Sequence, residues 1–202
     1  MANQDKSFNE KLLSYLQLVV SEGAQGAARG FSGILGQNLT VASPSVRTVN
    51  ILDIPNLLGG PEKEAVGIYL RAEGDLSGQI MLIIPYEKAF ELVDLLLGPM
   101  ERTSHDLGRL ERSALAEVGN MTGTFFLNAV ASMTGLSIRP TPPAVIVDMV
   151  GAIMDIIVAT TGGISEHVIL LGTTFTYGDR EVEAEFWVIP DTSSLETFTK
   201  PN

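Results

Sequence analysis

Hydrophobic and polar positions change from helical to strand spacing along the first half of the chain. Apolar residues between Phe8 and Gly36 recur every three or four positions, which predicts a helix. Three runs rich in Val, Ile and Leu follow and predict strands, the last two forming a hairpin. These runs lie within residues 39–52, 64–74 and 77–85. Residues 86–98 return to helical spacing and predict a second helix, with Gly98-Pro99 as its stop.

The second half repeats this order. A helix is expected from about Ser104 to Thr134, then an extended proline-rich run, a strand from about Glu166 and a closing strand that ends at Pro190. The segment "IMLIIP" of the first half corresponds to "EFWVIP" of the second, and "ASPSV" to "TPPAV". We therefore expect residues 1–202 to form a single domain made of two internal repeats, at about 8–98 and 104–199.

Strands in hairpins, with helices at the ends of the repeats, favour a particular fold class. We expect an α+β fold with pseudo-two-fold symmetry, in which two long helices pack on a central, mostly antiparallel sheet. The apolar stretch from Ala144 to Thr160 is interrupted by Asp148 and Asp155 and is shorter than a bilayer span, so it is expected to be buried core.

The helix expected from about Ser104 has recognisable ends. Thr103 and Asp106 resemble a capping box, and Gly135 suits the residue after a helix. One side of this helix is apolar and should face the core or a partner helix. Gly119 and Gly123 should allow another helix, or a partner's backbone, to approach closely.

The opposite side of this helix carries one narrow polar stripe. With Ser113 at zero and a rotation of 100° per residue, its members fall within about 60° of that position. They are Ser113, Glu117, Asn120, Thr124 and Asn128. Glu followed by Asn three residues later also arises by chance on a solvent face, but Asn is a weak helix former in mid-helix.

Composition excludes several classes of function. The formal net charge of -11 opposes binding to nucleic acid or to anionic membranes. The absence of cysteine excludes disulfides and thiolate chemistry, and the two histidines, His105 and His167, lack the spacing of a hydrolytic triad. The first ten residues do not resemble a secretory signal, which favours a cytoplasmic location.

The stripe lies within a recognisable signature. Ser113, Glu117, Asn120 and Pro143 fit, without a gap, the pattern Asp or Ser, three residues, Glu, two residues, Asn, twenty-two residues, Pro. This pattern resembles the signature of the CheC, CheX and FliY chemotaxis phosphatases, with CheC the most similar in length and in duplication. The resemblance extends over nearly the whole chain.

The resemblance implies hydrolysis of the aspartyl-phosphate on a CheY-type response regulator. It implies that Asn120 orients the attacking water and that Glu117 docks the regulator, while Ser113, Thr124 and Pro143 support the site. Mg²⁺ is then expected in the regulator's own acidic pocket, and no metal or cofactor is expected on this chain. Pro143 reads as a structural residue that holds the segment leaving the helix.

The first repeat departs from the signature and predicts a degenerate second site. Glu22 is retained, but Leu18 stands in place of Asp or Ser, and Gln25 in place of Asn. Positioning a water tolerates little displacement, so the extra methylene of Gln25 predicts a weak or silent site.

Two other functions stay open from the sequence. One is a non-catalytic adaptor that binds the regulator or CheD within the chemotaxis or flagellar-switch system. The other is a small-ligand domain, which would need a closed apolar pocket with Asn120 buried in it. The family resemblance adds CheD as a partner to test, and the residues leave open the choice between monomer and dimer.

Overall fold

The structure is a computed structural model of the chain, and most of the second repeat and the strands of the first are described in it. The described residues are 18, 21–23, 25–26, 40–41, 45–99, 105–160, 167–177 and 180–191. Most of the helix expected between Phe8 and Gly36 lies outside these residues. Positions 18, 21–23 and 25–26 are helical, as that prediction requires.

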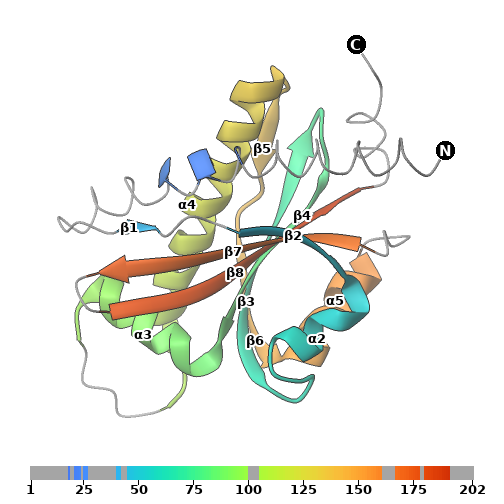
Figure 1. The fold of residues 1–202 in the computed structure, drawn as a ribbon. Coiled ribbons are helices and arrows are strands. Elements are labelled where there is room, and N and C mark those ends of the chain that lie inside the picture. Colours follow the sequence, from blue (N-terminus) through green and yellow to red (C-terminus); the bar gives the residue numbers. More distant parts are fainter. Residues whose placement is uncertain are drawn as a thin grey trace.

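The elements follow one another in the predicted order, with additions (Figure 1). The first half contains β1 (Thr40–Val41), β2 (Ser45–Asn50), the 3₁₀ turn η1 (Ile51–Asp53), α2 (Ile54–Leu57), β3 (Glu64–Gly74), β4 (Gly78–Pro85) and α3 (Tyr86–Leu97). The second contains α4 (Arg109–Thr134), β5 (Ile138–Pro140), β6 (Ala144–Met149), α5 (Val150–Thr160), β7 (His167–Tyr177) and β8 (Arg180–Pro190).

The strands form one antiparallel sheet. Its order is β1-β7-β8-β4-β3-β5, with β2 also paired to β7 and β6 also paired to β3. Every described pairing is antiparallel, and β3 and β4 form the expected hairpin. The α+β fold class with a mostly antiparallel sheet is therefore confirmed.

The two halves exchange strands across this sheet. From the first half, β2 pairs with β7, so that Arg47 lies opposite Leu170. From the second half, β6 pairs with β3, so that Gly67 lies opposite Ile146. The hairpins β3–β4 and β7–β8 meet where β4 pairs with β8. This reciprocal pairing is what two repeats sharing one sheet would produce, while the division into repeats itself stays a prediction.

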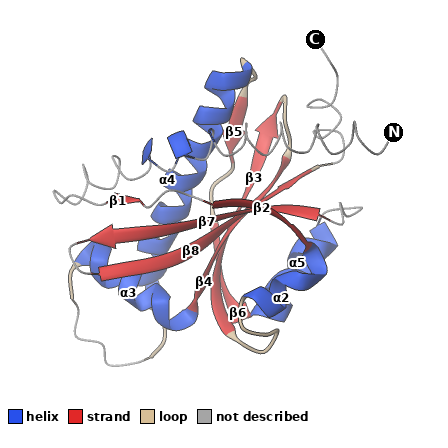
Figure 2. Ribbon diagram, viewed as in Figure 1, coloured by secondary structure: helices blue, strands red, loops and turns tan. Residues whose placement is uncertain are grey.

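Helices cover both faces of the sheet (Figures 1 and 2). On one face, α3 and α4 pack on a core that includes Ile80 and Leu82 of β4. On the other, α2 and α5 pack on a second core that includes Met81 and Ile83 of the same strand. Successive side chains of a strand point to opposite faces, so a strand covered on both sides must be apolar throughout. This explains the continuous apolar run in β4.

The ends of the two longer described helices test the predicted stops. Gly98 follows α3 with a φ of 85°, and Gly135 follows α4 with a φ of 72°, a backbone conformation that glycine adopts readily. The predicted start of α4 is wrong, because the helix begins at Arg109 with Gly108 as its N-cap and without a side-chain cap. Asp106 lies outside the helix, so it does not complete a capping box there.

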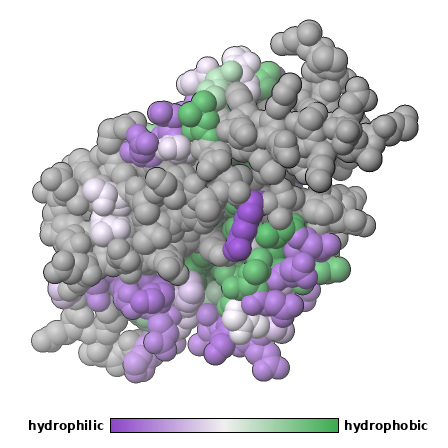
Figure 3. Space-filling view, viewed as in Figure 1, coloured by the Kyte–Doolittle hydropathy of each residue, from purple (hydrophilic) through white to green (hydrophobic). Residues whose placement is uncertain are grey.

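Two helical segments were not predicted from the pattern of the chain. The stretch from Ala144 to Thr160 divides into β6 and α5, where the amides of Val150 and Gly151 donate to the carbonyls of Lys63 and Pro61. Apolar side chains gather over α2 and α5 in Figure 3, in keeping with the exposure of Leu57 and Ile156 there. Across the described ranges, no helix is long and apolar enough to cross a membrane.

Candidate functional site

The polar stripe of α4 lies on the exposed side of the helix. Ser113, Glu117 and Asn128 are exposed, while Asn120 and Thr124 are half-buried. Glu117 and Asn120 are three residues apart, which places them about 4.5 Å apart along the helix axis and on neighbouring positions of its surface. The stripe is therefore a continuous surface with a carboxylate and an amide side by side.

The opposite side of α4 is buried as the pattern predicts. Leu115, Val118 and Phe126 are almost wholly buried in the core beneath α3 and α4. Phe126 meets Phe186 of β8 edge to face, with ring centroids 5.2 Å apart. This packing fixes the rotation of the helix about its axis, so the face that carries Glu117 and Asn120 must point outward.

Two glycines bring α4 close to strand β3. A Cβ at Gly119 would overlap the side chain of Ile68, and one at Gly123 would lie 2.7 Å from Leu70 Cδ2. Glycine is thus needed at both positions for the observed approach of helix to sheet. The expected close packing is confirmed, but its partner is a strand instead of another helix. Asn120, which follows Gly119, is held on a helix that is seated firmly on the sheet.

Pro143 packs against α4 although it is distant in sequence from the stripe. A Cβ at Gly119 would lie 3.7 Å from the Cβ of Pro143, so this proline packs beside the residue that precedes Asn120. The run between β5 and β6 is tied to β3, because Arg71 N–H donates to Thr141 Oγ1 (2.9 Å) and Thr141 N–H donates to the Arg71 carbonyl (2.8 Å). The structure therefore places Pro143 against α4 at Gly119, the residue before Asn120.

The segment before α4 is anchored by side chains that reach back to it. The Tyr86 hydroxyl donates to the His105 carbonyl at 2.7 Å, and Arg112 Nε donates to the Leu107 carbonyl at 3.0 Å. Leu107 itself is buried. These contacts fix the beginning of the helix close to Ser113, so the first part of the stripe also has a defined place.

The degenerate site of the first repeat lies on the helical residues before Gly26. Leu18, Glu22 and Gln25 are exposed, and Gln25 Nε2 lies 3.4 Å from Ser21 Oγ as a hydrogen-bond donor. A Cβ at Gly23 would lie 3.0 Å from Phe126 Cα, so this segment runs against α4. The structure therefore places Glu22 beside the helix that carries Glu117 and Asn120, a proximity that helical spacing alone does not reveal.

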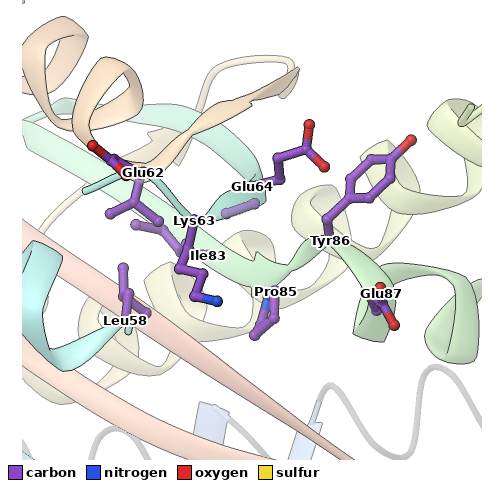
Figure 4. A pocket seen from close by; sticks show the side chains of 10 residues that line it. Leu58, Glu62, Lys63, Glu64, Ile83, Pro85, Tyr86 and Glu87 are labelled. Atoms are coloured by element: carbon purple, nitrogen blue, oxygen red, sulfur yellow. The ribbon is translucent and has the colours of Figure 1, made fainter. Parts of the chain in front are cut away.

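Two pockets among the described residues bear on the small-ligand alternative. One pocket of about 490 Å³ lies between α2, β3 and the start of α3, where Lys63, Pro85 and Glu87 line an opening with apolar Ile83 behind them (Figure 4). A second pocket, also of about 490 Å³, lies between residues 22–26 and α4. Asn120 lines neither pocket. The structure gives no support there to a domain that buries Asn120 against a small ligand.

Metal-binding groups were also sought in the described part of the chain. No cluster of three or more His, Asp or Glu side chains there is arranged to hold a metal ion. His105 is exposed, and its carbonyl accepts a hydrogen bond from Tyr86. On α4, the carboxylate of Glu117 is exposed and the amide of Asn120 is half-buried, so both groups are presented at a surface.

This architecture defines a class of protein: two hairpins in one sheet that strands exchanged between the halves complete, with a long helix that presents a carboxylate and an amide outward. The CheC-like family model matches residues 110–147, a range that contains all four signature positions. A relative in Bacillus subtilis, named CheY-P phosphatase CheC, is 28% identical over 191 residues, 93% of this chain and 91% of that protein. The chain is therefore CheC-like in sequence, as its signature predicts.

Solved structures share the fold. FliY of Thermotoga maritima matches with a TM-score of 0.70 and 17% identity, covering 92% of each chain. CheX in a complex with CheY, BeF₃ and Mg²⁺ from Borrelia burgdorferi matches with a TM-score of 0.51 and 19% identity, covering 84% of this chain and 96% of that one. These likenesses confirm the fold.

Proposed function

We propose that this chain is a chemotaxis phosphatase that hydrolyses the aspartyl-phosphate of a CheY-type response regulator. The single observation that carries the proposal is the outward pair of Glu117 and Asn120 on α4, within the region matched by the CheC-like family model. The name of the Bacillus subtilis relative, CheY-P phosphatase CheC, supports the reaction. The substrate is a whole protein, which suits a surface site better than a deep pocket.

Asn120 is proposed to orient the attacking water. Hydrolysis of an acyl phosphate needs a water in line with the scissile bond, and catalysis by placement gains from a group that holds it there. The Asn amide both donates and accepts hydrogen bonds, and it adds no negative charge beside the phosphoryl oxygens. Its half-buried position on a firmly packed helix supports this role, because a positioning group must itself be held in place.

Glu117 is proposed to dock the regulator. An exposed carboxylate next to a phosphoryl group would repel it, so its useful partner is a cation on the regulator's surface, such as a lysine. Ser113 and Thr124 would extend the docking surface on either side, and Pro143 would support the helix near Gly119. Mg²⁺ is proposed to sit in the regulator, where its charge would offset that of the phosphoryl oxygens.

The test is to mix the purified protein with a phosphorylated CheY-type regulator and Mg²⁺ and to follow the loss of phosphate. The wild type should accelerate this loss, and Asn120→Ala should reduce the acceleration by roughly 100-fold or more, the scale of a misplaced reacting group. Gln25→Ala, the matched change in the first repeat, should retain most of the activity.

A wild type that binds the regulator without accelerating the loss of phosphate would replace this proposal with the adaptor function. The fold is compatible with that outcome, since FliM of Helicobacter pylori, solved in a complex with FliG, matches with a TM-score of 0.64. Binding of CheD stays a prediction from the family resemblance, and mixing the two purified proteins on a sizing column would test it.

A further inference from the structure

A groove beside the proposed site joins the two halves of the chain. It has a volume of about 490 Å³ and lies between the helical residues around Glu22 and the second half of α4. Glu22 and Gly26 line one side, and Phe125, Asn128, Ser132 and Met133 line the other. Its lining on α4 therefore starts at Phe125, directly after Thr124, and includes Asn128, the last member of the polar stripe.

The groove exists because two glycines let the first segment approach α4. A Cβ at Gly26 would lie 2.9 Å from Phe125 Cδ1, and a Cβ at Gly23 would lie 3.0 Å from Phe126 Cα. The absence of side chains at these positions sets Glu22 against the side of α4. Because Gly26 has no side chain, the ring of Phe125 is not covered by one at that position.

The lining selects one kind of occupant. Among the described residues that line the groove, Glu22 is the one that carries a charge, and it is exposed. Phe125 and Met133 provide an apolar floor, and Asn128 and Ser132 provide polar groups at its edge. A carboxylate above an aromatic and apolar floor suits a long basic side chain, whose stem packs on the floor while its cationic head meets the carboxylate.

The groove lies within reach of a protein docked at Asn120. Asn128 is eight residues further along α4, which corresponds to about 12 Å along the helix axis. A response regulator is a globular domain wider than this distance, so one molecule can cover both places.

We propose that the groove binds an arginine or lysine side chain of the same regulator molecule whose phosphoryl group faces Asn120. The inference rests on the proposed function and adds a second docking contact to it. Glu22 then serves in docking, although the first repeat lacks the Asn of the signature. The complex has one regulator per chain, held at Glu117 and at Glu22.

The experiment is a calorimetric titration with a CheY-type regulator loaded with beryllofluoride and Mg²⁺, a stable mimic of the phosphorylated state. Glu22→Gln should weaken binding about tenfold, because it removes one partner of an interfacial charge pair. Ser132→Trp should weaken it by a similar factor by filling the groove. Glu62→Gln is the matched control, since it removes one exposed carboxylate that does not line the groove and should change the affinity less than twofold.

Kinetics with the phosphorylated regulator separate docking from catalysis. Glu22→Gln should raise KM about tenfold and leave kcat within twofold of the wild type, whereas partial unfolding would lower the apparent kcat without raising KM. A stoichiometry of two regulators per chain that falls to one in Glu22→Gln would overturn the proposal in favour of a separate second site. Equal affinities for Glu22→Gln and Glu62→Gln would overturn it as well.

The two proposals fail in different ways. If the wild type binds the loaded regulator but does not hydrolyse the phosphorylated one, the phosphatase function fails, while a weaker Glu22→Gln complex still supports the groove. If hydrolysis is normal and Glu22→Gln binds like the wild type, only the groove contact fails. A wild type that binds no regulator would reject both.

Discussion

Glu117 and Asn120 are neighbours on α4, but they differ in how they are held. Glu117 is exposed and has the freedom to meet a partner, whereas Asn120 is half-buried beside Gly119, where the helix rests on Ile68 and Pro143. A docking group gains from reach, and a positioning group gains from restraint. The difference in burial therefore matches the two roles that we propose for them.

A reversal of charge at Glu117 tests its proposed role. Glu117→Lys should raise KM for the phosphorylated regulator at least about tenfold, because like charges then meet in the interface. The effect on kcat should be much smaller, since the Asn120 amide is unchanged. Initial rates over a range of regulator concentrations measure both quantities, and Glu87→Lys, on an exposed position of α3, is the control. A fall in kcat with KM unchanged would contradict a docking role.

At the scale of elements, the position of α4 depends on strand β3. The helix is 26 residues long. Its glycines 119 and 123 leave space in which the side chains of Ile68 and Leu70 of β3 pack. Both ends of the helix are held in place. Leu107, which precedes it, is buried, and the Gly135 amide, which follows it, donates to the Ala131 carbonyl. The exposed stripe is thus a consequence of how the helix meets the sheet.

Adding a methyl group at Gly119 tests whether the close contact between α4 and β3 holds the helix in position. Gly119→Ala should lower the free energy of unfolding by about 1–2 kcal/mol, because the cost of overpacking against fully buried Ile68 exceeds the gain in helix propensity. Phosphatase activity should fall further than stability alone explains, since Asn120 is the next residue. Chemical denaturation and initial rates measure the two effects.

The control for this substitution is a double-mutant cycle. Ile68→Ala alone should destabilise by about 2–5 kcal/mol through a cavity, but combined with Gly119→Ala the loss should be smaller than the sum. Strict additivity would mean that the two residues do not press on each other, and the seating of α4 would need another cause.

At the scale of the whole molecule, the exchange of strands makes the halves depend on each other. β2 completes the sheet beside β7, and β6 completes it beside β3. Separating the halves would expose edge strands and both faces of the shared sheet. We therefore expect the chain to unfold as one cooperative unit, although each half contains its own hairpin.

Trp187 provides a probe for that expectation. It is the single tryptophan of the chain and is buried in the core beneath α5, on the face opposite to α4. Its fluorescence and the far-ultraviolet circular dichroism should report the same unfolding midpoint. Leu82→Ala, in the core on the other face, should shift both midpoints equally and cost about 2–5 kcal/mol. Two separate transitions would show instead that the halves fold independently.

The sequence by itself determined much of the local structure and the chemistry of the stripe. Strand runs bounded by turns predicted β3 and β4, because side-chain pattern and turn residues act locally. The rotation of 100° per residue predicted which side of α4 is polar, and the structure agrees because the opposite side, with Val118 and Phe126, is buried. The roles of Glu117 and Asn120 came from the family signature and stay a proposal.

The tertiary structure decided what local pattern could not express. The start of α4 at Arg109 depends on Leu107 and on the contact with Tyr86, so the apparent capping box before it was misleading. The division of the apolar stretch into β6 and α5 depends on pairing with β3, since an apolar run fits a buried strand and a buried helix equally well. The position of Glu22 beside Phe125 depends on residues about a hundred positions apart, and contacts at that separation arise only when the folded chain brings them together.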